Sequence, residues 1–127
     1  MTRLVLIGAG GALGSIARYV LSGLVQTLAR SETFPVGTLA VNIFGCFVIG
    51  VLSYLADSRG AFTADTRAFL MVGLLGGFTT FSAFGNETMN LLRDAERWLA
   101  SLNVVAHVVV GIGAVWAGRA TAFSIWR

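Results

Sequence analysis

Charged residues are nearly absent from four long stretches of this sequence. The first stretch holds one charge, Arg18, and the other three hold none. About 20 residues of α-helix cross the roughly 30 Å of hydrocarbon in a bilayer, and each stretch is about that long. The pattern therefore predicts an all-α membrane protein built as one four-helix domain, residues 1–127. The expected spans are about 4–29, 34–56, 67–93 and 98–120.

The composition argues against a soluble domain and against a nucleic-acid-binding protein. Charged residues make up 12% of the chain, whereas soluble domains carry about 25%. So few charges cannot cover a soluble surface without leaving large apolar patches. All nine basic residues are arginine, and they are spread along the chain rather than gathered in a basic patch. The single cysteine, Cys46, is interpreted as a small packing residue.

The first stretch has two other interpretations. Arg3 precedes an apolar run, as in a signal peptide, and the glycines at 8, 10 and 14 resemble a dinucleotide-binding loop. The run stays apolar up to Leu28, however, and no alternation of strands and amphipathic helices follows it. We therefore expect a helix in which Gly10 and Gly14, one turn apart, let another helix approach closely.

The arginines in the loops give only a weak preference for one orientation in the membrane. An excess of positive charge in short loops marks the cytoplasmic side. With four spans, five arginines lie on the side of both termini and three lie opposite: Arg3, Arg59, Arg67, Arg119 and Arg127 against Arg30, Arg93 and Arg97. A chain with so small a bias is able to insert both ways and to form an antiparallel homodimer.

The third stretch contains a pattern that favours a break in the middle of the membrane. Gly76 and Gly77 precede the hydroxyl residues Thr79, Thr80 and Ser82. Glycine weakens the helix, and hydroxyl groups can satisfy the backbone groups that a break releases. Carbonyl groups exposed at such a break are ligands for a small cation, and exposed N–H groups are ligands for an anion. The alternative is a continuous helix with a packing face of small residues.

Two polar residues lie deep in the first and second stretches. Arg18 falls near the middle of its span, where inserting an arginine costs about 2.5 kcal/mol or more. In the bundle interior or in a water-filled vestibule it would attract anions, and the alternative is that it snorkels to an interface. Asn42, with Thr38 one turn before it, offers amide donors to an anion. An interhelical hydrogen bond is an equally good interpretation of Asn42.

Phe81 and Phe84 share one helix face directly after the predicted break. One interpretation is that they are ordinary core or lipid-facing residues. The other is that the positive edges of their rings contact an anion, because a ring edge binds an anion less tightly than a fixed charge does. In the fourth stretch Asn103 and His107 lie along one stripe, and a hydrogen-bonded structural histidine is the default interpretation. Glu87 is either a buried acid or the start of the interfacial region.

Three runs in this order carry a resemblance to a known family: GGALGSIARY (10–19), GTLAVNIFG (37–45) and GGFTTFSAF (76–84). Together they resemble the Fluc (CrcB) family of fluoride channels, and the resemblance covers all four spans. It implies an antiparallel, dual-topology homodimer of four-helix subunits, with two fluoride pores between them. The implied role is passive export of cytoplasmic fluoride across the bacterial inner membrane, down its electrochemical gradient.

The resemblance also implies roles for single residues of the fluoride pathway. The pore phenylalanines of the family match Phe81 and Phe84, the pore asparagine matches Asn42, and the vestibule arginine matches Arg18. Positions that contribute hydroxyl groups around the pathway match Thr38, Thr80 and Ser82.

The family's broken helix holds a structural sodium ion at the centre of the dimer, and the backbone carbonyls implied as its ligands are those of Gly76 and Thr79. The fourth stretch departs from the family. Where members often have a track of hydroxyl residues beside the phenylalanines, this chain has Asn103, His107 and Gly111. Asn103 and His107 are therefore further candidates for the pathway.

Two other function classes fit a four-helix membrane protein of this size. A small dual-topology exporter of cationic drugs coupled to protons would need an acid in the first span, where this chain has Arg18. A non-transporting scaffold subunit would use its glycines and asparagines for packing only. An enzyme is disfavoured, because the candidate acid–base groups, His107 and Glu87, have no evident third member or cofactor motif.

Overall fold

The computed structural model describes residues 1–126, and these residues form four long helices. The first two are α1 (Thr2–Ala29) and α2 (Val36–Arg59). The third comprises α3 (Ala64–Arg67), the π-helical η1 (Ala68–Leu75), α4 (Gly76–Phe78) and α5 (Phe81–Arg93), and the fourth comprises α6 (Arg97–Val105), the π-helical η2 (Ala106–Val110) and α7 (Gly111–Ile125). Each of the four is long and apolar enough to cross a membrane, which confirms the predicted all-helical, four-span architecture.

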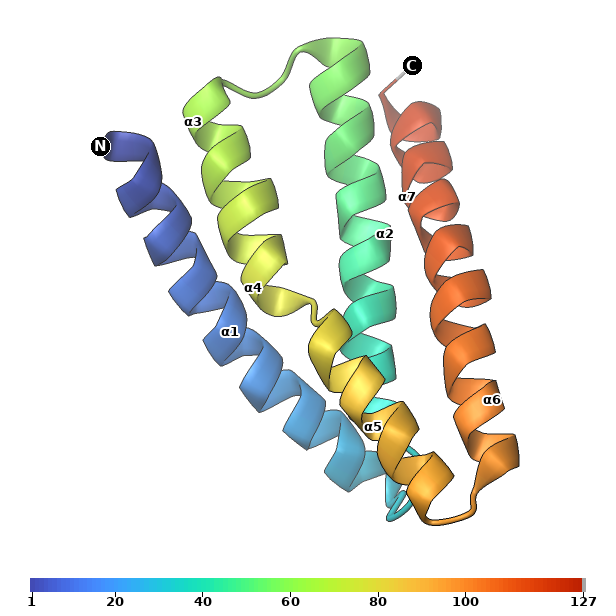
Figure 1. Cartoon of the computed structure of the whole chain (residues 1–127). Helices are drawn as coiled ribbons and strands as arrows, with labels where there is room; N and C mark the ends of the chain where they lie inside the picture. Colours follow the sequence, from blue (N-terminus) through green and yellow to red (C-terminus); the bar gives the residue numbers. More distant parts are fainter. Residues whose placement is uncertain (127) are drawn as a thin grey trace.

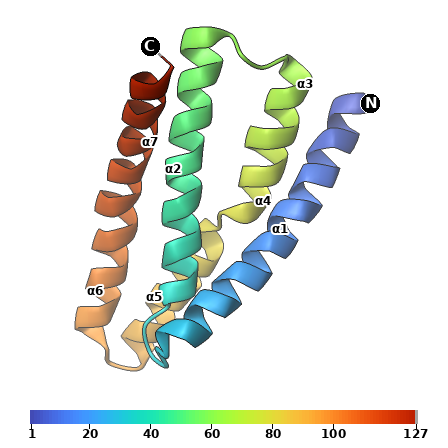
Figure 2. The same cartoon turned by 180° about the vertical axis from the view of Figure 1, so that it is seen from behind.

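The helices run up and down between two ends of the molecule. The start of α1, the end of α7 and the connection from α2 to α3 lie at one end, and the connections from α1 to α2 and from α5 to α6 lie at the other (Figure 1). Seen from either side, α1 runs beside η1 and α4, whereas α2 lies next to α7 (Figure 2). The first half of the broken third helix thereby packs along the first helix, whereas its second half, α5, packs mainly against α6.

The second and fourth helices are longer at their C-terminal ends than the spans predicted from the sequence. The second continues from the expected end at residue 56 through Asp57 to Arg59, and the fourth continues from 120 to Ile125. Asp57 of the second helix lies 3.6 Å from Arg119 of the fourth. In the first turns of α1 and α3, Arg3 lies 2.7 Å from Asp65. A charge-free stretch therefore indicates the part of a helix that lies in hydrocarbon, whereas the helix itself continues into the interface.

Glycines make the close helix contacts possible. A Cβ atom added at Gly10 would lie 2.6 Å from the Phe69 carbonyl oxygen, and one added at Gly14 would collide with the carbonyl oxygen of Leu74. These contacts confirm that the two glycines let another helix approach, and the helix that approaches is the third one. On the other side of the bundle, a Cβ atom at Gly118 of α7 would collide with the Phe47 carbonyl oxygen of α2.

We expect Gly118→Ala to lower the melting temperature of the purified protein by several degrees, because overpacking of this kind costs about 1–3 kcal/mol. Gly113→Ala is the matched control, since a Cβ atom at Gly113 on the same helix meets nothing within 4 Å. The control should leave the melting temperature unchanged or slightly raised. Thermal unfolding in detergent measures both variants, and equal melting temperatures would contradict the close contact between α2 and α7.

Candidate functional site

The third helix is interrupted at Thr79 and Thr80. Helix α4 ends at Phe78, both threonines have extended backbones (φ −90° and ψ 155°, then φ −150° and ψ 114°), and α5 begins at Phe81. The Thr80 side chain caps the new helix, because its Oγ1 accepts the Ala83 N–H at 3.1 Å. The break lies within the region near 76–80 where the glycines and hydroxyl residues predict it, one residue after the two glycines.

Asn42 of α2 spans this break with its side-chain amide. Its Oδ1 accepts the Thr80 N–H at 2.9 Å, and its Nδ2 donates to the Thr80 carbonyl at 3.1 Å. In an unbroken helix these two backbone groups would bond within the helix, so Asn42 supplies the partners that the break removes. Asn42 is only 8% exposed, so its own amide group also needs these hydrogen-bond partners.

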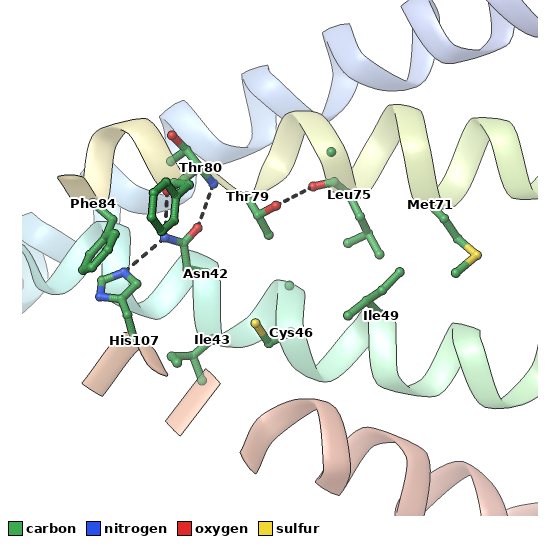
Figure 3. A pocket seen from close by; sticks show the side chains of 13 residues that line it. Asn42, Ile43, Cys46, Ile49, Met71, Leu75, Thr79, Thr80, Phe84 and His107 are labelled. Atoms are coloured by element: carbon green, nitrogen blue, oxygen red, sulfur yellow. Dashed lines mark hydrogen bonds between the residues drawn. The ribbon is translucent and has the colours of Figure 1, made fainter. Parts of the chain in front are cut away.

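The same amide reaches the fourth helix through His107. Asn42 Nδ2 lies 3.1 Å from His107 Nε2 (Figure 3). His107 Nδ1 lies 2.9 Å from the Asn103 carbonyl oxygen. The imidazole ring also packs on Phe84, with 4.3 Å between ring centroids. His107 lies in the π-helical segment η2, and such wide turns occur frequently at functional sites. Three of the four long helices thus meet at one small polar cluster.

This cluster opens into a cavity of about 370 Å³. The predicted pore residues Asn42, Phe81 and Phe84 line the cavity together with Thr80 and His107. The Phe81 and Phe84 ring centroids are 5.3 Å apart, and Phe81 is 83% exposed in the single chain. The structure therefore brings amide, hydroxyl and aromatic groups from α2, the third helix and η2 together around one open space.

Arg18 lies neither in this cavity nor free at an interface. Its Nε donates to the Gly77 carbonyl at 3.0 Å, and Ser15 Oγ approaches the same oxygen at 3.5 Å. The charged side chain thus stabilises the last turn before the break. Sequence reasoning missed this pairing, although a signal was present: Ser15 and Arg18 are three residues apart and therefore lie on one helix face with the close-packed Gly14.

Thr38 lies in a second cavity of about 350 Å³. Its hydroxyl donates to Glu87 Oε1 at 2.6 Å, and both residues line that space together with Gln26 and Glu32. Glu87 is half-buried against α2. Thr38 therefore does not line the cavity that Asn42 lines. It pairs instead with Glu87, for which the sequence allowed either a buried or an interfacial position.

Asn103 and Ser82 lie beside the main cavity rather than on its wall. Asn103 is fully buried, and its Nδ2 donates to Thr88 Oγ1 at 3.0 Å. Ser82 Oγ lies 3.2 Å from Thr80 Oγ1. Thr88 went unnoticed in the sequence, but it follows Phe84 by one turn and its hydroxyl donates to the Phe84 carbonyl, so it belongs to the same helix face.

The carbonyls of Gly76 and Thr79 have lost their usual helical donors. In a continuous helix the Gly76 carbonyl would accept the Thr80 N–H and the Thr79 carbonyl would accept the Ala83 N–H. Those two N–H groups instead donate to Asn42 Oδ1 and to Thr80 Oγ1. Both residues line the main cavity. Carbonyl oxygens suit a hard cation, so the residues present fit the sodium ion that the resemblance implies.

Comparison with known sequences identifies the family. The sequence model of the family described as "CrcB-like protein, Camphor Resistance (CrcB)" matches residues 5–119. The chain belongs to the CrcB family. Among its CrcB relatives, the "Fluoride-specific ion channel FluC" of Methylobacillus flagellatus is 48% identical over 93% of this chain and 92% of its own length. The protein of the same name from Opitutus terrae is 48% identical over 94% of this chain and 91% of its own length. "Fluoride-specific ion channel FluC 3" of Methanosarcina barkeri is 41% identical over 98% of this chain and 93% of its own length.

Proposed function

We propose that this membrane protein is a fluoride-specific ion channel that exports cytoplasmic fluoride passively, down its electrochemical gradient. The observation that carries the proposal is the near-full-length similarity to relatives with that name, at 48% identity over more than nine-tenths of each chain. The geometry of the site agrees with it, since Asn42, Phe81 and Phe84 line a single cavity at the helix break.

The chemistry around the cavity suits a small, strongly hydrated anion. A pore must replace the water around fluoride with hydrogen-bond donors and polarised groups, because removing an unpaired ion from water is very costly. A fixed cation in the narrow part would hold the ion too tightly for conduction. Here Arg18 is outside the cavity lining and donates from Nε to the Gly77 carbonyl. The polar part of the cavity wall comes from Asn42, Thr79, Thr80 and His107, and the aromatic rings of Phe81 and Phe84 line the same cavity together with apolar side chains.

We further propose that two copies assemble antiparallel and enclose two pathways. Phe81 lines the main cavity, and this large aromatic residue is 83% exposed in the single chain. A second copy would supply the missing wall. The weak arginine bias of five against three is compatible with insertion of both orientations in the bacterial inner membrane.

The Gly76 and Thr79 carbonyls of both copies would hold a structural sodium ion. If they do, sodium should raise the stability of the folded protein, because a ligand that binds only the folded state stabilises it by RT ln(1 + [L]/Kd). We expect a higher melting temperature in sodium chloride than in N-methylglucamine chloride of the same concentration, and lithium or potassium should substitute less well. Equal melting temperatures in all these salts would argue against a sodium site.

Fluoride efflux from liposomes tests the proposed function directly. Vesicles with the purified protein are loaded with potassium fluoride or potassium chloride, and a potassium ionophore sets the voltage. Fast fluoride efflux with little chloride efflux is expected. Absence of fluoride efflux from folded, incorporated protein would overturn the proposal and favour a scaffold subunit, whereas efflux of a lipophilic cation driven by a proton gradient would favour a drug exporter.

A further inference from the structure

We propose that His107 is a positioning residue of the fluoride pathway: in its neutral form, with the proton on Nδ1, it holds the Asn42 amide across the helix break, and its protonation releases that amide and lowers fluoride flux. This inference rests on the proposed channel function. It assigns His107 a role through Asn42 and Phe84, as distinct from the pathway-lining role considered for it above.

The hydrogen bonds of Asn42 fix the orientation of its amide. The Thr80 N–H is a donor and can only face Oδ1, and the Thr80 carbonyl is an acceptor and can only face Nδ2. The second hydrogen of Nδ2 then points at His107 Nε2, 3.1 Å away (Figure 3). This ring nitrogen must therefore carry a lone pair and no proton.

The other ring nitrogen leads independently to the same tautomer. His107 Nδ1 lies 2.9 Å from the Asn103 carbonyl oxygen, which is an acceptor only, so Nδ1 must carry the proton. Both contacts together specify neutral imidazole with hydrogen on Nδ1 and a lone pair on Nε2. A histidine held between one donor and one acceptor in this way has a single compatible protonation state.

A second proton on the ring cannot be accommodated by turning the amide over. Protonated Nε2–H would face the Asn42 Nδ2 hydrogens, donor against donor. Rotating the amide by 180° would bring Oδ1 to His107, but it would also place Nδ2 against the Thr80 N–H and Oδ1 against the Thr80 carbonyl. Protonation therefore breaks the bond between His107 and Asn42, and leaves the fixed cation beside Phe84, 4.3 Å from its ring centroid.

The titratable groups that face His107 come from two neighbouring helices. Glu87 on α5 is close enough to interact with the ring electrostatically, and the Cys46 thiol on α2 lines the same cavity. On its own helix the described charged residues are Arg97 and Arg119, ten or more positions away along the chain. Glu87 is thus the group whose own titration most needs to be separated from that of His107.

The first experiment is the pH profile of fluoride efflux, with equal pH inside and outside the vesicles. Flux should be lost progressively from pH 8 to pH 5.5, because a second proton on the His107 ring removes the lone pair that accepts from the Asn42 amide. Protein-free vesicles at each pH give the leak of hydrogen fluoride to be subtracted. Fast flux at pH 8 that does not change down to pH 5.5 would overturn this inference and leave the channel function intact.

Variants distinguish a positioning role from a merely structural one. His107→Gln keeps a side-chain acceptor and a donor but cannot titrate, so its flux should be independent of pH and at least tenfold above that of His107→Ala at pH 8. Glu87→Gln should keep the acid loss of the native protein. An acid loss that survives in His107→Gln, or that disappears in Glu87→Gln, would overturn the assignment to His107.

A spectroscopic measurement tests the tautomer without any flux. The chain contains one histidine, so ring ¹⁵N labelling gives a single imidazole signal pair in the purified protein. At pH 8 the shifts should report protonated Nδ1 and unprotonated Nε2, and Asn42→Ala should shift Nε2 more than Nδ1. Protonated Nε2 at pH 8, or a ring that stays neutral down to pH 5.5, would overturn the inference even in a protein that conducts.

Discussion

Replacing Asn42 by alanine is expected to lower fluoride flux between about tenfold and a thousandfold. The substitution leaves the Thr80 N–H and carbonyl, both now bonded to Asn42, without these partners in a half-buried position. Each buried polar group left unpaired costs about 1–3 kcal/mol, and about 1.4 kcal/mol corresponds to a factor of ten. The break loses its ordered geometry, and His107 loses its partner on α2 at the same time.

The measurement is initial fluoride efflux per protein in liposomes, with size-exclusion chromatography as the test of folding. Asn90→Ala is the matched control, because Asn90 is an exposed asparagine of α5 outside the cavity. Asn42→Asp adds a sharper comparison. Its carboxylate can still accept the Thr80 N–H but repels the Thr80 carbonyl and an entering anion, so it should conduct no better than Asn42→Ala. Native flux from either Asn42 variant would show that the amide bridge is dispensable.

Replacing Phe81 by isoleucine should bring fluoride flux down to the level of protein-free vesicles, while the protein still folds and assembles. Isoleucine keeps an apolar side chain of tolerable volume but has no ring, so it offers the anion no positive edge. An ion that loses a partner in a dry passage is destabilised by more than about 3 kcal/mol. That loss corresponds to a reduction in rate of more than about a hundredfold.

Phe44→Ile is the matched control for this substitution. Phe44 lies on α2 in the membrane region, is 58% exposed and packs edge-on against Phe78, but it does not line the main cavity. Flux should survive in Phe44→Ile and disappear in Phe81→Ile. If both variants conducted equally well, the exposed ring beside the break would have no part in permeation.

The architecture could be predicted from the sequence because hydrocarbon excludes charge. The absence of charged residues marks the membrane-crossing part of each helix, and the two glycines before Thr79 and Thr80 mark the point where the third helix breaks. The helix ends were predicted less well. Asp57 and Arg119 lie within helices and pair with one another, which a count of uncharged residues cannot detect.

Within the site, the side-chain partners were harder to predict than the residues. Asn42 and Arg18 were each left with two interpretations, and the structure gives Asn42 interhelical bonds and gives Arg18 a backbone partner, Gly77. To predict such partners, one must know how far every helix is rotated about its own axis. In a soluble protein the apolar stripe of a helix shows which face is buried and so gives this rotation. Here the lipid and the bundle interior are both apolar, so the period of the hydrophobic residues gives little information about the rotation.

The interruption at Thr79 and Thr80 also places two opposite helix ends against each other. The peptide dipoles of α3, η1 and α4 add up to partial negative charge at Phe78, and those of α5 add up to partial positive charge at Phe81. A continuous helix would cancel both charges within its length. The broken one presents a pole that favours a cation and, two residues further along the chain, a pole that favours an anion, so one short segment would suit both the proposed sodium ion and fluoride without any charged side chain of its own.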